Sequence, residues 1–516
     1  MELLDLQGQL TRMSSPASAS DAQIDSIRFV LDGEVIELND VDPTRTVMQF
    51  LREDLRRTGT KEGCAEGDCG ACTVVLAELN RERNDITLRA VNSCIQFLPT
   101  LDGKELITVE SLCSAGSELH PVQQALVDHH GSQCGFCTPG FVMSLFALYK
   151  SNANPSRCEI DDTLAGNLCR CTGYRPIIAA AEAMYEAESS TDWLRQSAAA
   201  SQVPSERVEA LKSLQRGGAM QLAGNGRSFF APATADELAA VLADHPGATI
   251  LAGGTDVGLW VTKQHRELDV VVYTGRVAEL RELQVSATHI ECGAAVSLTD
   301  AMVLVVEHYP GLDELFTRFA SPPIRNAATL GGNIANGSPI GDSMPALMVA
   351  ETTLVLRSAS GSREIALDDY YLDYQVSALK PGEFIETVRI PLPAKDSVLR
   401  SHKLSKRFDQ DISAVCMAYR LELDGDRVSL FRMACGGLAA TIRRAKHCEA
   451  QIEGQEWNEE TIERAAAALE QDFAPISDMR ASAGYRLRAA QNLLRRFYLE
   501  TCGELQQTVY SYGRQS

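Results

Sequence analysis

Three cysteines stand close together in a glycine-rich stretch of the sequence, "EGCAEGDCGACTVVL" (62–76). Cys64, Cys69 and Cys72 have the spacing C-x4-C-x2-C, and Cys94 follows in "VNSCIQF". Four thiolates from one tight loop and one distant segment can hold two irons, and this spacing is that of plant-type [2Fe–2S] sites. The glycines let the backbone curl around such a cluster and turn N–H groups toward its sulfurs. A structural zinc site is the alternative, although zinc usually takes two C-x2-C pairs.

A second set of four cysteines lies in "QCGFCTPG" and "CRCTGYRPI", as the pairs Cys134/Cys137 and Cys169/Cys171. Each pair precedes an expected helix start, because proline follows at 139 and at 176 and is favoured in a first helical turn. Two helix N-termini would then direct partial positive charge toward the thiolates, which lowers thiol pKa and favours an anionic metal–sulfur centre. This spacing alone leaves iron–sulfur and zinc both open.

The elements around the first set form a small α+β unit. Residues 26–40 alternate apolar and polar side chains on both sides of Asp32-Gly33, which predicts a hairpin with a tight turn. Residues 46–57 have the apolar spacing of an amphipathic helix, and 73–79 ("TVVLAEL") read as a strand.

Two further stretches are rich in glycine and small polar residues. "ILAGGTDV" (250–257) follows an expected strand at 248–251 and could hold a pyrophosphate on its free N–H groups. Alone it is a weak signal, because Gly-Gly turns are common. "RNAATLGGNIANGSPIGDSMPAL" (325–347) lets a backbone approach a ligand closely, and two such loops suit an extended dinucleotide.

Composition limits the class of protein. A chain of 516 residues with 45% hydrophobic and 23% charged residues predicts several globular domains, and a net charge of −21 argues against a nucleic-acid partner. The first twenty residues show no apolar signal segment and no run is long enough for a membrane span, so we expect a cytoplasmic protein with reduced thiols. The nine histidines form no C-x-H pair, which argues against a Rieske centre.

Both cysteine sets together resemble the iron–sulfur half of the molybdenum hydroxylases, the xanthine dehydrogenase family, over roughly 22–187. The glycine-rich stretches and the tail (412–437 and 476–500) are similar to the flavoprotein half of that family. The resemblance implies a multidomain α+β fold. Its expected domains are a β-grasp [2Fe–2S] ferredoxin domain (22–108), a four-helix-bundle [2Fe–2S] domain (109–187), a vanillyl-alcohol-oxidase-type FAD-binding domain (217–395) and a CO-dehydrogenase-flavoprotein-like C-terminal α+β domain (396–505). Between the two halves, residues 188–216 are rich in Ser, Ala, Glu and Gln with little apolar periodicity until the end, which predicts a solvated linker.

Site residues follow from the resemblance position by position. Two [2Fe–2S] clusters are implied on Cys64, Cys69, Cys72 and Cys94, and on Cys134, Cys137, Cys169 and Cys171. FAD is implied on a first pyrophosphate loop, a second one, an aromatic near the flavin, an acid at the ribityl chain and a lysine: Ile250, Leu251, Ala252, Gly253, Gly254, Thr255, Asp256, Val257; Thr329, Leu330, Gly331, Gly332, Asn333; Phe319; Asp342; Lys403. The first loop reads Gly-Gly-Thr-Asp where the animal enzymes have Gly-Asn-Thr-Glu. "KRFDQDIS" (406–413) matches the charged segment beside the flavin, where nicotinamide approaches.

The resemblance also implies a division of labour. The molybdopterin domain of the family is much larger than anything after residue 500, so we expect a small subunit that pairs with a molybdopterin-binding large subunit, as two small and two large chains. Electrons would pass through both clusters to FAD and then to NAD. This order of domains on one chain is that of xanthine dehydrogenases, which favours oxidation of hypoxanthine and xanthine to urate.

Two other functions remain open at this point. The same subunit could serve an aldehyde or N-heterocycle hydroxylase, because the substrate pocket would lie on the partner. A non-catalytic iron–sulfur redox sensor is a second alternative, but it would not need two dinucleotide loops. No nucleophile–base constellation is recognisable, as expected where the chemistry belongs to cofactors.

Overall fold

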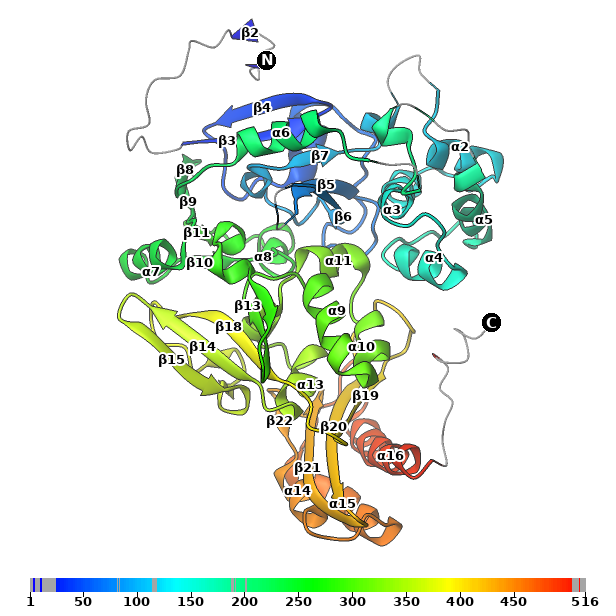
Figure 1. The fold of residues 1–516 in the computed structure, drawn as a ribbon, viewed down its shortest axis with the longest axis vertical. Coiled ribbons are helices and arrows are strands. Elements are labelled where there is room, and N and C mark those ends of the chain that lie inside the picture. Colours follow the sequence, from blue (N-terminus) through cyan, green and yellow to red (C-terminus); the bar gives the residue numbers. More distant parts are fainter. Residues whose placement is uncertain are drawn as a thin grey trace. The chain divides into compact units, whose positions relative to one another are not determined.

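The computed structural model describes residues 25–503 except 81, 83, 114–117, 187–189, 191, 200 and 201, together with Tyr510 and the short strands β1 (Leu3–Leu4) and β2 (Leu10–Thr11). The expectation about a leader therefore lies largely outside the described residues, as do the start of the first domain at 22–24, parts of the linker and the end of the last domain at 504–505. The chain divides into two compact units (Figure 1): Met1–Val241 with Gly247–Val277 and Ser321–Ala328, and Leu242–Pro246 with Ala278–Ala320 and Thr329–Ser516.

The first unit begins with a five-stranded sheet in the order β4-β3-β7-β5-β6. Its strands are β3 (Ser26–Leu31), β4 (Glu34–Asn39), β5 (Thr73–Leu79), β6 (Ile86–Asn92) and β7 (Glu105–Ile107). The predicted hairpin is confirmed: Asp32 and Gly33 both have positive φ (53° and 81°), as a tight turn between twisted strands requires. The predicted strand at 73–79 is β5.

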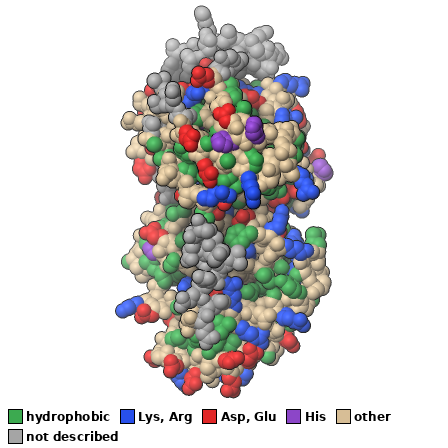
Figure 2. Space-filling view, turned by 90° about the vertical axis from the view of Figure 1, so that its right-hand side faces the viewer, with side chains coloured by type: hydrophobic (Ala, Val, Ile, Leu, Met, Phe, Trp, Pro, Cys, Tyr) green, Lys and Arg blue, Asp and Glu red, His purple; other side chains and the backbone are tan. Residues whose placement is uncertain are grey.

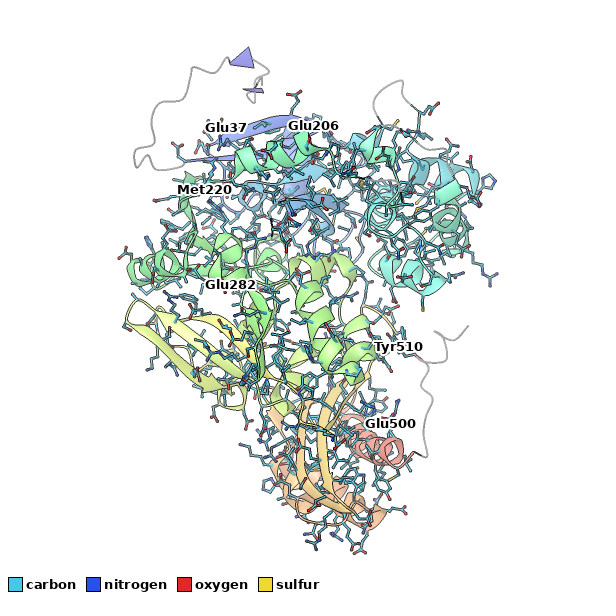
Figure 3. All side chains as sticks on the ribbon, in the orientation of Figure 1. Glu37, Glu206, Met220, Glu282, Glu500 and Tyr510 are labelled. Atoms are coloured by element: carbon cyan, nitrogen blue, oxygen red, sulfur yellow. The ribbon has the colours of Figure 1, made fainter. Side chains whose placement is uncertain are left out.

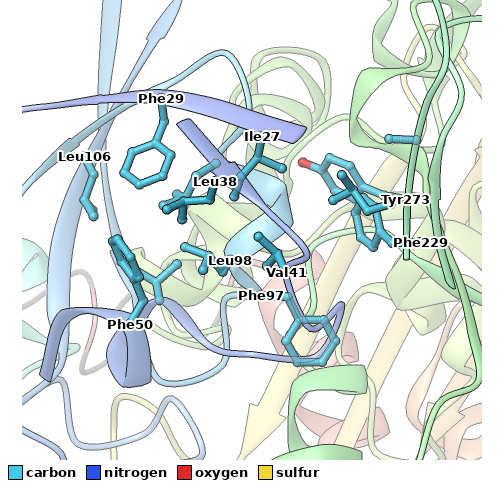
Figure 4. Packing of buried hydrophobic residues seen from close by; sticks show 14 of the residues in the cluster. Ile27, Phe29, Leu38, Val41, Phe50, Phe97, Leu98, Leu106, Phe229 and Tyr273 are labelled. Carbon is cyan, nitrogen blue, oxygen red and sulfur yellow. The ribbon is translucent and has the colours of Figure 1, made fainter. Parts of the chain in front are cut away.

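The helix predicted over 46–57 is shorter than expected. It forms α1 (Val47–Gln49), which Thr46 caps, and continues as a π-helical turn, η1 (Phe50–Asp54). Arg56 then adopts a left-handed φ of 57°, which a continuing helix does not allow. The buried face packs Phe50 edge-on against Phe29, with ring centroids 5.8 Å apart (Figure 4).

Four helices follow, as the predicted helical domain requires: α2 (Pro121–Asp128), α3 (Thr138–Ser151), α4 (Arg157–Leu164) and α5 (Arg175–Ala183). Helix α3 is buried along most of its length, and Phe141, Leu145 and Phe146 are fully covered. Both predicted helix starts are confirmed, since α3 begins directly after Cys137 and α5 begins at the residue before Pro176.

The prediction of a solvated linker is wrong for its described second half. Residues 205–214 form α6 (Ser205–Leu214; Glu206 in its first turn is labelled in Figure 3), in which Val208, Leu211 and Leu214 are buried. Leu211 and Leu214 pack on Val30 and Val35 of the first hairpin. Their spacing of three residues is helical, but the polar composition of the segment concealed it.

A smaller sheet, in the order β10-β11-β9-β8, belongs to the same unit. It contains β8 (Met220–Gly224), β9 (Arg227–Ala231), β10 (Thr249–Leu251) and β11 (Val270–Tyr273). The unit also contains helix α8 (Val257–Thr262) and helix α11 (Pro322–Ala327), whose Asn326 donates to the carbonyl oxygen of Ala90 in β6 at 3.0 Å. Phe229 and Tyr273 share one hydrophobic cluster with Ile27 and Leu38 of the first sheet (Figure 4), so the two sheets are joined by a continuous core. Helix α7 (Ala235–Asp244) spans the boundary between the units.

Among its described residues, the second unit contains two larger sheets and one two-stranded sheet. One is antiparallel, in the order β12-β13-β18-β14-β15: β12 (Leu283–Val285), β13 (His289–Gly293), β18 (Phe384–Pro391), β14 (Thr353–Ser358), β15 (Gly361–Ala366). Its helices are α9 (Leu298–His308), α10 (Asp313–Thr317), α12 (Leu330–Asn336) and α13 (Ser343–Val349), and a small hairpin pairs β16 (Tyr371–Asp373) with β17 (Val376–Ser377).

The other sheet forms the C-terminal part of this unit, with β19 (Val398–Leu404), β20 (Val415–Asp424), β21 (Arg427–Gly436) and β22 (Arg443–Arg444). The predicted strands on both sides of Asp424-Gly425 are confirmed. Helices α14 (Lys446–Ile452), α15 (Glu459–Asp472) and α16 (Ala483–Thr501) cover it, the last of these being the expected closing helix. Glu500 of α16 (Figure 3) pairs with His402 of β19 at 3.0 Å.

Two features concern the surface of the described residues. Among them, no helix combines the length and the apolarity needed to cross a bilayer. On the face shown in Figure 2, Lys and Arg side chains are interspersed with Asp and Glu side chains.

Candidate metal and cofactor sites

The structure brings the first four cysteines together. Cys72 Sγ lies 3.2 Å from Cys94 Sγ, and Cys64 is hydrogen-bonded with Cys69 and Cys94. Three backbone N–H groups, of Glu66, Asp68 and Cys69, point at Cys64 Sγ from 3.4–3.5 Å. This is the cage of N–H donors that the glycine-rich loop predicted, and it favours a negatively charged sulfur.

Because the thiols lie so close together, their pKa values shift in opposite directions. Hydrogen bonds from Cys69 and Cys94 hold the pKa of Cys64 well below its ordinary value. The pKa of Cys69 and that of Cys94 are raised, first by the hydrogen bond with Cys64 and then by further burial and neighbouring charge. Four thiolates at this spacing repel one another, so full ionisation of the set requires a cationic centre among them.

The second set of four also converges. Cys134 Sγ and Cys171 Sγ lie 3.6 Å apart, and Cys137 is hydrogen-bonded with Cys169. Burial raises the pKa of Cys137 to about 12, whereas Cys134 and Cys171 are exposed. This set therefore presents one half-buried pair, Cys137 and Cys169, and one exposed pair, whereas the first set contains two buried cysteines, Cys72 and Cys94.

Both sets fit a binuclear centre. Each consists of two thiol pairs, Cys64/Cys69 with Cys72/Cys94 and Cys134/Cys171 with Cys137/Cys169. Among the residues that the structure describes, no group of three or more potential ligands closes around a single metal ion. Two pairs, each able to hold one iron, are the donor arrangement of an all-cysteine [2Fe–2S] site.

The first glycine-rich loop lies in the first unit, directly beside the first thiol set. Gly254 has a φ of 76°, and a Cβ on Gly253 would collide with the carbonyl oxygen of Ala327. A Cβ on Gly258 would lie 2.7 Å from the carbonyl oxygen of Ile95, the residue after Cys94. Thr262 Oγ1 of α8 donates to the carbonyl oxygen of Ala65 at 2.8 Å, inside the cysteine loop. Helix α8 is thus seated on the segment that carries Cys64 and Cys69.

The second glycine-rich stretch is more helical than a loop prediction implies. Thr329 caps α12, its Oγ1 accepting from the N–H of Gly332 at 3.0 Å, and Gly337 ends the helix with a left-handed φ of 59°. Gly331 packs so closely on Ala294 that no side chain fits. The side-chain amide oxygen of Asn333 accepts from Ser343 at 2.6 Å. The backbone conformation of residues 329–337 is therefore set by the caps at the two ends of α12.

Asp342 and Lys403 form a buried ion pair in the second unit, 2.6 Å apart, with side chains 4% and 2% exposed. Ser413 donates to the other carboxylate oxygen at 2.5 Å, and Lys403 also donates to the carbonyl oxygen of Arg318 at 3.2 Å. A carboxylate offers about four acceptor positions, so Asp342 keeps capacity for ligand hydroxyls. Sequence reasoning gave no role to Ser413 or Arg318, although Ser413 ends the segment 406–413, because only the packed chain brings these residues to the Asp342–Lys403 pair.

Phe319 is half-buried and follows Arg318 directly. The guanidinium of Arg318 lies 4.6 Å from the ring centroid of Phe408, and its Nε donates to the carbonyl oxygen of Phe408 at 3.2 Å. Phe408 belongs to the charged segment 406–413, so Arg318 anchors that segment next to the Asp342–Lys403 pair within this unit.

Comparisons with known protein families agree with two iron–sulfur sites followed by a flavin-binding region. Four family models match, in chain order: 2Fe-2S iron-sulfur cluster binding domain (29–97), [2Fe-2S] binding domain (108–182), FAD binding domain in molybdopterin dehydrogenase (221–393) and CO dehydrogenase flavoprotein C-terminal domain (400–501). The fold and the two thiol sets therefore define an iron–sulfur flavoprotein, as predicted.

Comparison with individual proteins shows which iron–sulfur flavoproteins this chain is similar to. A xanthine dehydrogenase of Emericella nidulans is 34% identical over 97% of this chain and 41% of its own length, and an aldehyde oxidase 2 of Macaca fascicularis is 30% identical over 94% and 40%. A carbon monoxide dehydrogenase from Hydrogenophaga pseudoflava is similar in structure (TM-score 0.50, 26% identity, 52% of this chain and 94% of that chain). The chain belongs to the molybdenum hydroxylase family, as its iron–sulfur and flavin part. It spans about two fifths of the length of the curated relatives.

Proposed function

We propose that this chain is the electron-transfer part of a xanthine dehydrogenase and connects a molybdopterin centre with NAD. The observation that carries the proposal is the contact between α8, which follows the first glycine-rich loop, and the loop of the first thiol set. When bound, the [2Fe–2S] clusters supply one-electron transfer and FAD supplies exchange between single electrons and hydride. The chain's own residues hold these groups and exclude other ligands.

The proposed cluster ligands are the eight cysteines of the two sets. For FAD we propose backbone N–H groups of 250–257 and 329–333, with Phe319, Asp342 and Lys403. The burial of Asp342 and Lys403 supports a role in which both are fixed before the cofactor binds, so that little ordering entropy is lost on binding.

We further propose that the molybdopterin centre lies on a partner subunit, in an assembly of two small and two large chains, and that purines are the substrate. The similarity to xanthine dehydrogenases supports purine as the substrate, and the relative from Emericella nidulans, at 34% identity, matches over 97% of this chain. A reducing, cytoplasmic location is proposed because all fifteen cysteines are free thiols in the described structure.

The test compares the isolated chain with its complex. We expect the isolated chain to oxidise NADH with an artificial dye and to leave xanthine unchanged, and the complex purified from its native source to couple xanthine to NAD reduction. Acid precipitation should release the flavin into the supernatant, because we expect non-covalent FAD. Flavin retained in the pellet contradicts that expectation. Coupling of an aldehyde or N-heterocycle instead of xanthine would favour the alternative hydroxylase.

A further inference from the structure

Asn167 is buried at the place where the two cysteine-bearing regions meet, with 2% of its surface exposed. Its side-chain nitrogen donates to the carbonyl oxygen of Gly70 at 3.1 Å and to Thr73 Oγ1 at 3.3 Å. Its side-chain oxygen accepts from Ser144 Oγ at 2.7 Å. One amide therefore joins the first cysteine loop to α3.

These partners are adjacent to cluster ligands in the sequence. Gly70 lies between Cys69 and Cys72, and Asn167 stands two residues before Cys169. Ser144 belongs to α3, the helix that begins directly after Cys137. The two hydrogen bonds that Asn167 donates, to Gly70 and Thr73, thus tie the segment before Cys169 to the loop of the first thiol set, and the bond from Ser144 fixes the same amide on the helix that follows Cys137.

The backbones themselves are in direct contact around this amide. The N–H of Leu168 donates to the carbonyl oxygen of Cys69 at 3.0 Å. A Cβ on Gly70 would strike the carbonyl oxygen of Gly166, and a Cβ on Gly140 would strike that of Gly70. Since no side chain separates these segments, a small displacement here changes the separation of the thiol sets directly.

We propose that Asn167 is a positioning residue that sets the separation and relative orientation of the two iron–sulfur centres. The inference rests on the proposed function, because it assumes that both thiol sets hold clusters. The chemistry of the side chain carries it: an amide donates to Gly70 and Thr73 while accepting from Ser144, whereas aspartate lacks the donor and leucine lacks both functions. A buried carbonyl or hydroxyl group that loses its hydrogen-bond partner either moves toward a new partner or stays unsatisfied, which destabilises the folded state.

The test measures the magnetic dipolar splitting between the two reduced clusters by low-temperature EPR, using the full chain. This splitting depends on the distance and orientation between the centres, so a residue that only stabilises the fold would leave it unchanged in the folded protein. We expect Asn167→Ala to retain both cluster signals and the full iron content while changing the splitting. Asn167→Asp should also change it, because a carboxylate oxygen would face the carbonyl of Gly70.

Asn152→Ala is the matched control, because Asn152 is an asparagine after α3 whose side chain donates to Glu159 on the same helical domain. It should leave the splitting as in the wild type. An unchanged splitting in Asn167→Ala overturns the proposal, and so does loss of one cluster signal, which would assign Asn167 to cluster assembly. If Asn167→Ala does not fold, Ser144→Ala, which removes a single hydrogen bond, must change the splitting. A wild type with one cluster signal would instead refute the proposed function, and this inference with it.

Discussion

Breaking the buried pair of Asp342 and Lys403 should destabilise the second unit strongly. In Lys403→Met the carboxylate stays buried and keeps only Ser413 as a side-chain donor. Removing one partner of a buried ion pair costs about 3–5 kcal/mol. This lowers the ratio of folded to unfolded protein by roughly two to four powers of ten.

Two comparisons define the size of the effect. Ser413→Ala removes one hydrogen bond to a charged group, which costs about 1.5–3 kcal/mol, and should therefore be milder. The double variant Asp342→Asn/Lys403→Met leaves no buried charge and should be more stable than Lys403→Met alone. Residues in contact typically show interaction energies of about 0.5–3 kcal/mol in such a cycle.

The structure provides a local probe for this experiment. Of the three tryptophans, only Trp457 belongs to the second unit, where it packs on Phe431 and Phe497. Urea unfolding of flavin-free protein in a Trp193→Phe/Trp260→Phe background would follow this unit by fluorescence, without linkage to the ligand. The reasoning would be refuted if the losses of unfolding free energy at Asp342 and Lys403 were strictly additive in the double variant. It would also be refuted if Lys403→Met destabilised the protein less than Ser413→Ala.

Three further predictions address other sites. Cys171→Ser should remove one of two EPR signals of the reduced protein while Cys158→Ser removes neither; a single signal in the wild type, or stoichiometric zinc, would contradict the cluster assignment. Burial lowers the pKa of His120 from 6.5 to about 4, while its ring nitrogens bond the N–H of Val122 and the carbonyl of Leu194. The unfolded chain thus binds more protons between these values, so stability should rise by about 3 kcal/mol from pH 4 to pH 6.5, and His120→Asn should flatten this slope in pH-dependent urea titrations. Gly258→Ala should cost about 1–3 kcal/mol because its Cβ meets Ile95, whereas Gly247→Ala, with nothing within 4 Å, should cost less; equal unfolding midpoints would contradict this contact.

The sequence determined the elements whose cause is local. The Asp32-Gly33 turn, strand β5 and the starts of α3 and α5 follow from residues within a few positions of each element, because turn geometry and proline act on adjacent backbone. The spacing of the eight cysteines also carried the prediction of two metal sites and, with the glycine-rich stretches, the resemblance to the family. Spacing alone did not distinguish zinc from iron for the second set.

Only the tertiary structure decided which distant residues act together. Ser413 reaches Asp342, Asn167 reaches Gly70, and Leu211 packs on Val30, all across long sequence separations. No local pattern encodes these contacts, because a buried polar group takes whichever partner the packed chain brings within hydrogen-bonding distance. Residues 205–214 show the same limit, since a mostly polar segment forms a helix with one buried face once its three apolar residues have a surface to pack on.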